Sequence, residues 1–231
     1  MRILLTGASG FIGRHLRAAL LAEGHTLILP ARHAAARASG PRMRYVEADF
    51  TRDLDPAAWL PRLEGVEVVV NAVGILRERG RQRFEEIHIR APRALFLACE
   101  AVAVRLVLQL SALGADAAAS SGYHLSKKAA DDFLLTLRLH AVVVQPSLVF
   151  GADGASARRF TGMASWPLLP RLGRGDALIQ PLHIDDLVAA LITLIAKPPG
   201  RGGRLPLAGP RALTLTDYLQ TLRAAMGLAR A

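Results

Sequence analysis

Three residues in the middle of the chain carry side chains that together could move a proton to or from a substrate oxygen. Tyr123 and Lys127 are four residues apart, so in a helix their phenol and ammonium lie on one face. Ser111 ends the apolar run that precedes this helix. A tyrosine with a pKa of about 10 is a poor base at neutral pH, but a neighbouring cation favours the phenolate. We therefore expect Lys127 to lower the pKa of Tyr123, which exchanges the proton, while Ser111 hydrogen-bonds the same substrate oxygen.

A glycine-rich turn close to the N-terminus could bind phosphate groups. The apolar run 2–6 leads into glycines at 7, 10 and 13, and an amphipathic segment follows over 11–21. In such a strand, turn and helix the first glycine permits the tight turn, the second lets phosphates approach the backbone, and the third lets the helix pack on the strand. The start of the helix adds unpaired N–H groups and the positive end of its dipole. We expect a dinucleotide pyrophosphate to bind at Gly7, Ser9, Gly10, Phe11, Ile12 and Gly13.

The end of the second expected strand indicates which dinucleotide binds. Sites for NAD commonly have an acidic residue there, which accepts hydrogen bonds from the adenosine ribose. This chain has Arg32 at that place and no carboxylate. A guanidinium pairs well with a 2′-phosphate, and Arg14, directly after the glycine turn, could be a second clamp. We expect NADP(H) to be favoured, with NAD(H) as the alternative; both arginines could also be solvated surface residues.

Further candidates for cofactor contact follow the ends of other expected strands. Asp49, with Phe50 beside it, could accept a hydrogen bond from the adenine amino group, or could cap the turn that follows. The small residues of 71–74 would let the backbone pass close to the cofactor, although a plain turn explains them equally well. The candidates are Asp49, Phe50, Asn71, Ala72, Val73, Gly74 and Pro146, and Lys127 is expected to hold the nicotinamide ribose.

The order of the elements predicts an α/β fold with a doubly wound parallel sheet of the Rossmann type, because strand-like and helix-like segments alternate. Valines over 66–70 predict a strand buried on both faces. The expected strands cover 2–6, 25–30, 43–47, 66–70, 104–110 and 141–145, and the expected helices 11–21, 84–103 and 122–139.

Beyond Gly151 the alternation loosens, as expected of loops that cover a substrate. Helical patterns return at 184–196 and at 214–226, the latter capped by Thr214 or Thr216. His183 with Asp185 and Asp186 favours helix capping over a metal site, and no metal is expected. We expect a dinucleotide-binding domain over 1–151 and a small substrate-covering lobe over 152–231, with the helix at 184–196 packed on the first domain.

Composition narrows the class of protein. The chain has 231 residues, of which 52% are hydrophobic, enough for a sizeable core. No apolar run reaches the roughly 18 residues of a spanning helix, and glycines interrupt the first apolar run before it resembles a secretory signal. Cys99 is the sole cysteine, which excludes an intrachain disulfide. We expect a cytoplasmic protein with no membrane insertion.

The net charge of +10 is a weak argument for nucleic-acid binding. All but three of the 29 basic residues are arginine, and arginine and alanine are both abundant, a pattern that coding composition can produce. The densest basic cluster, 77–83, contains Glu78 and no interleaved aromatic residue. We expect no nucleic-acid partner, and the charge fits phosphate-bearing small molecules equally well.

Together these motifs resemble the short-chain dehydrogenase/reductase superfamily. The resemblance rests on 6–13 (TGASGFIG), on 71–74 (NAVG), and on Ser111 with 123–127 (YHLSK). The stretches 146–151 and 180–186 resemble its extended or atypical branches, which hold nucleotide-sugar epimerases and dehydratases and proteins similar to an accessory subunit of respiratory complex I. The residues at 73–75 and 111–115 lean toward the latter group. The resemblance implies the fold, the dinucleotide and the Ser-Tyr-Lys roles, and no particular substrate.

Several positions depart from the pattern of that superfamily. Ser111 and Tyr123 are only 12 residues apart, whereas sugar epimerases usually have a longer insertion. His88 stands where an asparagine usually supports the lysine, and Gln145 where an arginine is frequent. The chain also stops short of the usual length, which a curtailed lobe or a missing domain would explain. These departures count against a sugar epimerase.

Three functions follow as hypotheses. The first is an NADP(H)-dependent oxidoreductase that acts on a carbonyl or alcohol through Ser111, Tyr123 and Lys127. The second is an NAD(P)-binding subunit or redox sensor without turnover, and the third a nucleotide-sugar epimerase or dehydratase. The expected partners are a small-molecule substrate and either a second copy, joined through the helices 84–103 and 122–139, or a larger protein.

Overall fold

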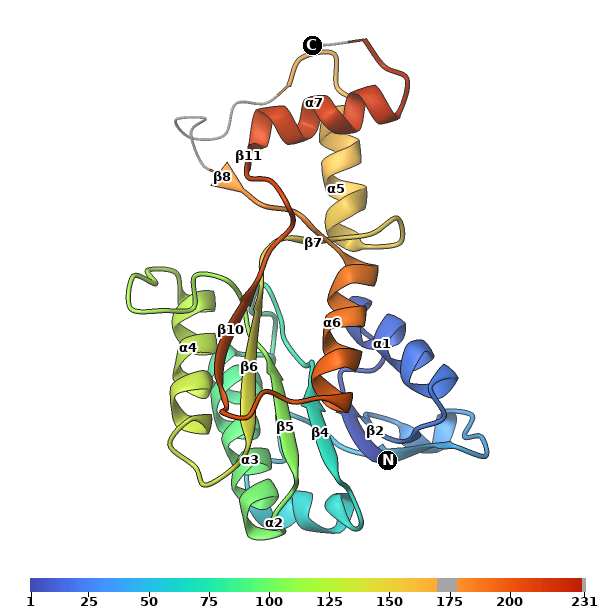
Figure 1. Cartoon of the computed structure of the whole chain (residues 1–231), viewed down its shortest axis with the longest axis vertical. Coiled ribbons are helices and arrows are strands. Elements are labelled where there is room, and N and C mark those ends of the chain that lie inside the picture. The colour runs from blue at the N-terminus through green and yellow to red at the C-terminus, as the bar shows by residue number, and fades with distance from the viewer. Residues whose placement is uncertain (170–177, 230–231) are drawn as a thin grey trace. The chain divides into compact units, whose positions relative to one another are not determined.

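A seven-stranded sheet forms the centre of the computed structural model, which describes residues 1–169 and 178–229 (Figure 1). The strand order is β10-β6-β5-β4-β1-β2-β3, and the pairs from β6 to β3 are parallel. The chain leaves β1 toward β2 and β3 and then returns to β4 on the other side of β1, so the strand order reverses there. Ligands bind at such a reversal, beyond the carboxyl ends of the strands. The strands are β1 (Arg2–Thr6), β2 (Thr26–Ala31), β3 (Met43–Glu47), β4 (Val68–Asn71), β5 (Leu106–Leu110), β6 (Ala141–Pro146) and β10 (Gly203–Leu207).

Helices cover both faces of this sheet (Figure 1). One face packs on α2 (Pro56–Trp59), α3 (Ala91–Ala101) and α4 (Gly122–Leu134), with Trp59 and Phe96 fully buried in the apolar core. The other face packs on α1 (Phe11–Ala22) through Leu16 and Leu20, also fully buried. The inner strands are apolar on both sides because helices lie on both sides.

The predicted Rossmann-type α/β fold is confirmed, and most predicted elements agree with the structure within two residues. The helix expected over 84–103 differs: it begins as a π-helix over Glu85–Arg90 and becomes α3 at Ala91. Pro92 in the first turn of α3 has no N–H to donate to the preceding turn. Helix α4 ends at Leu134 rather than at 139, because Leu135, Leu137 and Leu139 pack on the core from a turn instead.

The chain forms two compact units. The first comprises Met1–Gln145 and Val188–Pro206, and the second Pro146–Leu187 and Leu207–Ala231. The chain thus returns from the second unit to the sheet through part of α6 (Ile184–Ala196) and most of β10. The sequence did not predict β10, whose glycine and proline are unusual in a strand. Gly202, just before it, is needed because a Cβ there would lie 2.4 Å from the Ala141 carbonyl oxygen.

The second unit holds two packed helices and short strand pairs. Helix α7 begins after Thr214, whose side-chain oxygen accepts a hydrogen bond from the Asp217 N–H at 3.1 Å. Thr214 is one of the two residues predicted to cap this helix. The Phe160 and Tyr218 rings meet edge to face, with centroids 5.4 Å apart, between α5 and α7. Its elements are α5 (Ala155–Ala164), α7 (Leu215–Ala225) and the pairs β7 (Val149–Phe150) with β9 (Leu182–His183) and β8 (Leu178–Ile179) with β11 (Leu213–Thr214).

Over residues 1–169 and 178–229, no helix combines the length and apolarity needed to cross a membrane. In the same ranges, no three His, Cys, Asp or Glu side chains gather in a way that could hold a metal ion. The Asp185 N–H donates to His183 Nδ1 at 3.3 Å, so these residues meet at the start of α6, where capping was expected.

Candidate functional site

The glycine turn between β1 and α1 has no room for side chains on its inner side. Gly7 has φ +67°, a left-handed conformation that favours glycine. A Cβ on Gly7 would lie 2.5 Å from the Ala72 carbonyl oxygen, and one on Gly13 would lie 2.1 Å from the Gly7 carbonyl oxygen. The Gly10 N–H donates to that same oxygen at 2.8 Å and closes the turn. Close backbone contacts therefore account for the three glycines, as their spacing predicted.

The N-terminus of α1 has the features of an anion site. Gly10 is the N-cap residue, and no side chain caps the first turn. The free N–H groups of that turn and its positive dipole end can therefore serve a ligand. Arg14 leaves the turn with its guanidinium over the Phe11 ring, 5.2 Å from the centroid.

A crevice of about 270 Å³ lies beside this turn, at the carboxyl ends of the strands. It is lined by the first half of the glycine turn (7–10) and by the segments that follow β2, β3 and β4. Several sequence-predicted residues line it, and others lie outside its lining. Those that line it are Gly7, Ser9, Gly10, Arg32, Asp49, Phe50, Ala72, Val73 and Gly74; those outside are Phe11, Ile12, Gly13, Arg14, Asn71, Lys127 and Pro146.

One end of the crevice is rich in arginine. Arg32 and Arg37 both line it, and the Arg37 guanidinium stacks on the Tyr45 ring, 5.3 Å from the centroid. Glu47, the carboxylate at the end of β3, accepts hydrogen bonds from the backbone N–H groups of 33 and 34 at 3.0 and 2.8 Å. Those two bonds hold the Glu47 carboxylate against the backbone after β2, whereas the charge of Arg32 acts on Asp49. Neither Arg37 nor Tyr45 was predicted as a site residue; they lie 5 and 13 residues beyond Arg32.

Asp49 both lines the crevice and caps a turn. Its Oδ1 accepts hydrogen bonds from the Thr51 N–H at 2.9 Å and from the Thr51 hydroxyl at 2.8 Å. Burial raises the pKa of Asp49, but the Thr51 hydrogen bonds and the charges of Arg32 and Arg52 outweigh it, so the pKa lies below its usual value. The carboxylate is therefore ionised at neutral pH and can accept hydrogen bonds.

Asn71 supports the crevice from inside the sheet. It is fully buried, and its Oδ1 accepts from the Thr6 hydroxyl at 2.6 Å while its Nδ2 donates to Gln109 Oε1 at 2.7 Å. The Thr6 hydroxyl also accepts from the Ala72 N–H at 3.1 Å. The Asn71 side chain is thus committed to joining β1, β4 and β5. Pro146 likewise ends β6 as a buried residue.

Ser111, Lys127 and Tyr123 are brought together at the end of β5 and the start of α4. Lys127 is 3% exposed, and its Nζ donates to the Leu110 carbonyl oxygen at 2.5 Å. Burial lowers the pKa of Lys127 to about 8, against the opposing effect of Asp131. Its Nζ also lies close to the backbone of the crevice, since a Cβ on Gly74 would be 3.8 Å from it. Ser111 is buried and donates its hydroxyl proton to Asp131.

We expected Lys127 to lower the pKa of Tyr123, and this prediction is wrong, because the surrounding residues raise the pKa instead. Burial raises the pKa of Tyr123, and the Asp131 carboxylate raises it further. The phenol is therefore in its protonated form at neutral pH, ready to donate a proton rather than to accept one. Aromatic rings surround it: His124, His88 and Phe84, with centroids at 5.1, 5.7 and 6.3 Å.

His88 connects the crevice to the helix that carries Tyr123. It lies in the π-helix, 1% exposed, and its Nε2 accepts a hydrogen bond from the Ile75 N–H at 2.9 Å. Its Nδ1 lies 2.8 Å from the Ser126 hydroxyl, which donates to the Tyr123 carbonyl oxygen. Burial, aided by the Lys127 charge, lowers the pKa of His88 to about 3, so the ring is neutral and its Nδ1 carries the proton. π-helical turns are frequent at functional sites.

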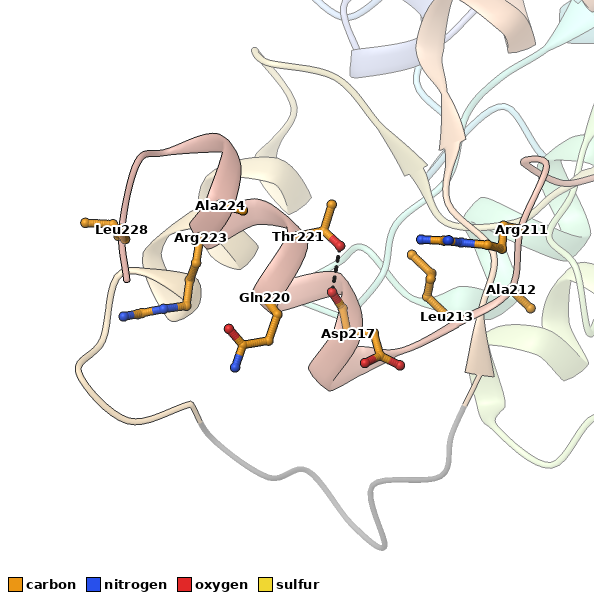
Figure 2. Close-up of a pocket in the computed structure, with 9 residues that line it drawn as sticks. All are labelled: Arg211, Ala212, Leu213, Asp217, Gln220, Thr221, Arg223, Ala224 and Leu228. Atoms are coloured by element: carbon orange, nitrogen blue, oxygen red, sulfur yellow. Dashed lines mark hydrogen bonds between the residues drawn. The ribbon is translucent and has the colours of Figure 1, made fainter. Parts of the chain in front are cut away.

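A second hollow, of about 620 Å³, lies within the second unit beside α7 (Figure 2). Arg223 on its wall is mostly buried, and its Nη1 donates to the carbonyl oxygens of Ala164 and Trp166, both at 2.6 Å. Its Nε donates to the Ala229 carbonyl oxygen at 2.8 Å. Arg223 therefore joins three segments of the second unit, and none of the sequence-predicted site residues lines this hollow.

Comparison with known proteins gives one family and several relatives. A family model for the NAD dependent epimerase/dehydratase family matches residues 3–204. The chain is similar to a ceramide reductase of Caulobacter vibrioides, with 30% identity over 85% of this chain and 61% of the relative. It is also similar to subunit 9 of the mitochondrial NADH dehydrogenase (ubiquinone) 1 alpha subcomplex of Arabidopsis thaliana, with 26% identity over 94% of this chain and 56% of the relative.

Solved structures share the fold along the whole chain. MoeE5 in complex with UDP-glucuronic acid and NAD matches with a TM-score of 0.81 and 20% identity, over 100% of this chain and 84% of that one. UDP-glucuronic acid 4-epimerase from Bacillus cereus, in complex with UDP-glucuronic acid and NAD, matches with a TM-score of 0.79 and 19% identity, over 100% and 85%. In contrast, this chain spans only 56–61% of the length of the two curated relatives described above.

Proposed function

The chain belongs to the NAD dependent epimerase/dehydratase family, and we propose that it binds NADP(H) and exchanges a hydride between this cofactor and a carbonyl or alcohol substrate. The observation that carries the proposal is the cradle of the glycine turn. Gly7 and Gly13 have no space for a Cβ, and the first turn of α1 has no side-chain cap. A pyrophosphate needs such a bare backbone and free N–H groups, so the residues present fit a dinucleotide.

The crevice beside the turn supports the placement of the rest of the cofactor. Asp49 and Phe50 line it beyond the turn on one side, and Ala72 to Gly74 line it after β4. We assign the adenosine to the end with Asp49 and Arg32. Gly74, where a Cβ would lie 3.8 Å from Lys127 Nζ, is then assigned to the nicotinamide end.

Arginine beside the adenosine end supports NADP(H) over NAD(H). Arg32 lines the crevice, and Glu47, the carboxylate at the end of β3, accepts hydrogen bonds from two backbone N–H groups. A 2′-phosphate would find the Arg32 guanidinium at the end of β2, where sites for NAD commonly have an acidic residue. Arg37, stacked on Tyr45, adds a second positive charge to the same wall.

The chemistry is assigned to residues on β5 and α4. The cofactor, when bound, supplies or accepts the hydride. The Tyr123 phenol, protonated at neutral pH, donates a proton to the substrate oxygen during reduction. Lys127 stabilises the phenolate that results and holds the nicotinamide ribose, and Ser111 hydrogen-bonds the substrate oxygen. The similarity to a ceramide reductase supports carbonyl reduction as the physiological class of reaction.

A dinucleotide-binding subunit without turnover is the second candidate. Two observations favour it: the Ser111 proton is directed at Asp131 rather than outward, and the pKa of Tyr123 is raised. The similarity to the NADH dehydrogenase subunits supports the same function. Epimerisation or dehydration of a nucleotide sugar has less support, because the neighbours with such ligands share the fold at 21% identity or less.

Cofactor binding and turnover test the two candidates separately. Isothermal titration with NADPH and NADH measures binding, and ligand binding to the folded state also raises the melting temperature. We expect NADPH to bind more tightly and to be oxidised in the presence of one of a panel of ketones and aldehydes, long-chain ketones included. Tight binding without hydride transfer to any of them would favour the subunit. A failure to bind either dinucleotide would overturn both.

A further inference from the structure

Asp131 is a buried carboxylate that the assigned chemistry does not use. It lies on α4 one turn beyond Lys127 and is fully buried. Its Oδ2 accepts the hydrogen bond from the Ser111 hydroxyl. Its Oδ1 has no partner in hydrogen-bonding geometry among the described residues, although the Gln109 amide is near enough to lower its pKa. A buried carboxylate with an unpaired oxygen lowers the stability of the fold, which calls for an explanation in terms of function.

The titratable and charged groups around Asp131 come from two elements. Lys127 and Tyr123 lie on its own helix α4, and Arg204 lies on β10. Burial raises the pKa of Asp131, and the Ser111 hydrogen bond, Lys127 and Arg204 only partly oppose this, so the pKa reaches about 6. Asp131 is therefore ionised at neutral pH and becomes protonated under mildly acidic conditions.

The protonation state of Asp131 decides what Ser111 can do. A serine hydroxyl has one proton to donate and two lone pairs that accept. While its proton goes to the Asp131 carboxylate, Ser111 can only accept, which suits a substrate alcohol. When Asp131 is protonated, its own O–H can donate to Ser111 Oγ, and the Ser111 proton is then free to point at a substrate carbonyl oxygen.

We propose that Asp131 is a positioning residue that sets the direction of the Ser111 hydrogen bond, so that its carboxylate form favours alcohol substrates and its acid form favours carbonyl substrates. The inference rests on the proposed hydride transfer, because it concerns the orientation of the substrate oxygen. It implies that oxidation and reduction respond in opposite ways to the protonation of one buried carboxyl group.

The first test is the pH profile of Asp131→Asn. An asparagine keeps the shape and can donate to Ser111 at every pH, so we expect kcat/KM for carbonyl reduction to lose its acid-favoured limb. In the unaltered enzyme, that value should fall roughly tenfold per pH unit above the pKa of Asp131 before it levels off. Asp132→Asn is the matched control, because Asp132 is the next residue on the helix and is exposed, paired with Lys128 and Arg204. An unchanged limb in Asp131→Asn would overturn the proposal.

The second test needs no turnover. The folded-state pKa of Asp131 is raised from 3.8 to about 6, so its stabilising contribution is present below 3.8 and is lost as the pH rises through 6. The melting temperature of the unaltered protein relative to Asp131→Asn should fall over this range. Because the Ser111 hydrogen bond lowers the pKa of Asp131, Ser111→Ala should move that fall to higher pH.

The two tests separate the possible failures. If no dinucleotide binds or no substrate is turned over, the proposed function fails, while the stability measurements still report on Ser111 and Asp131. If Ser111→Ala leaves the pH dependence of the melting temperature unmoved, the two side chains are not coupled and the inference is overturned. Should Asp131→Asn fail to fold, Ser111→Ala alone carries this test.

Discussion

The glycine turn and the Ser111–Tyr123–Lys127 cluster are specified in different ways. The turn depends on backbone shape: Gly7 has φ +67°, and a Cβ on Gly13 would collide with the Gly7 carbonyl oxygen. The cluster depends on protonation states, which burial and Asp131 change for both Tyr123 and Lys127. Glycine spacing therefore predicts the turn directly, whereas the chemistry of the cluster depends on neighbours that are distant in sequence. Variants of each region should fail in different measurements.

Tyr123→Phe should have the largest effect, and only on turnover. The phenyl ring keeps the contacts with Phe84 and His88 but has no proton to donate. General acid–base catalysis contributes roughly 10²–10⁴-fold, so kcat should fall by about that factor while the Kd for NADPH stays near its original value. Tyr218→Phe, in the second unit, is the control and should retain its activity. Equal turnover by the two variants would remove Tyr123 from the mechanism.

Gly13→Ala should disrupt the turn itself. The new Cβ would lie 2.1 Å from the Gly7 carbonyl oxygen, so the backbone of the turn must shift. We expect a loss of roughly 3 kcal/mol in the free energy of unfolding and weaker binding of NADPH and NADH alike. Gly162→Ala on the exposed surface of α5, where a Cβ meets nothing within 4 Å, should be neutral or stabilising. Denaturant unfolding and isothermal titration provide both measurements.

The contrast between local backbone shape and distant neighbours also explains which parts of the fold the sequence predicted. The strand at 43–47 and the helix at 184–196 have the predicted bounds. The helix buries one apolar face, which includes Leu187 and Leu191, whereas the strand is only partly buried. The resemblance to the epimerase/dehydratase branch is confirmed by the family match over 3–204. The strand β10 and the π-helix at Glu85–Arg90 were missed, since each is held by packing rather than by local propensity.

Within the site, the sequence could not predict the surroundings of each side chain. Asp131 stands four residues after Lys127, so the helical spacing that drew attention to Tyr123 could have drawn attention to it as well. Its burial, and the effect of its charge on the pKa of Tyr123, could not be inferred without the fold. The commitment of Asn71 to Thr6 and Gln109 likewise depends on the register of β1, β4 and β5.

His88→Asn tests the connection between the two regions. The substitution removes the acceptor for the Ile75 N–H, and a buried donor left unsatisfied costs roughly 2 kcal/mol in the free energy of unfolding at pH 7. Burial lowers the pKa of His88 from 6.5 to about 3, so its stabilising contribution is present above pH 6.5 and is lost as the pH falls toward 3.

The pH dependence separates a specific role of His88 from a general loss of packing. The unaltered protein should lose stability as the pH falls below 6.5, and His88→Asn should lose less. His33→Asn is the control, because His33 is exposed and has φ +57°, a conformation that asparagine tolerates. Identical pH slopes for the unaltered protein and His88→Asn in thermal unfolding would mean that His88 has the same pKa in the folded and unfolded states, which would contradict its burial as a neutral ring.

Arg32→Ala should have the smallest effect of these variants. It tests which dinucleotide binds at the glycine turn, rather than the structure of the turn itself. Arg32 lines the crevice and lowers the pKa of Asp49, so its charge reaches the proposed adenosine end. Losing a charge-assisted hydrogen bond to a 2′-phosphate should weaken NADPH binding by roughly tenfold and leave NADH binding unchanged. Arg52→Ala is the matched control, because Arg52 also faces Asp49, at 4.0 Å, but does not line the crevice. If NADH and NADPH weaken together, Arg32 acts on the shape of the crevice; if neither changes, the 2′-phosphate is read elsewhere, with Arg37 on Tyr45 as the next residue to replace.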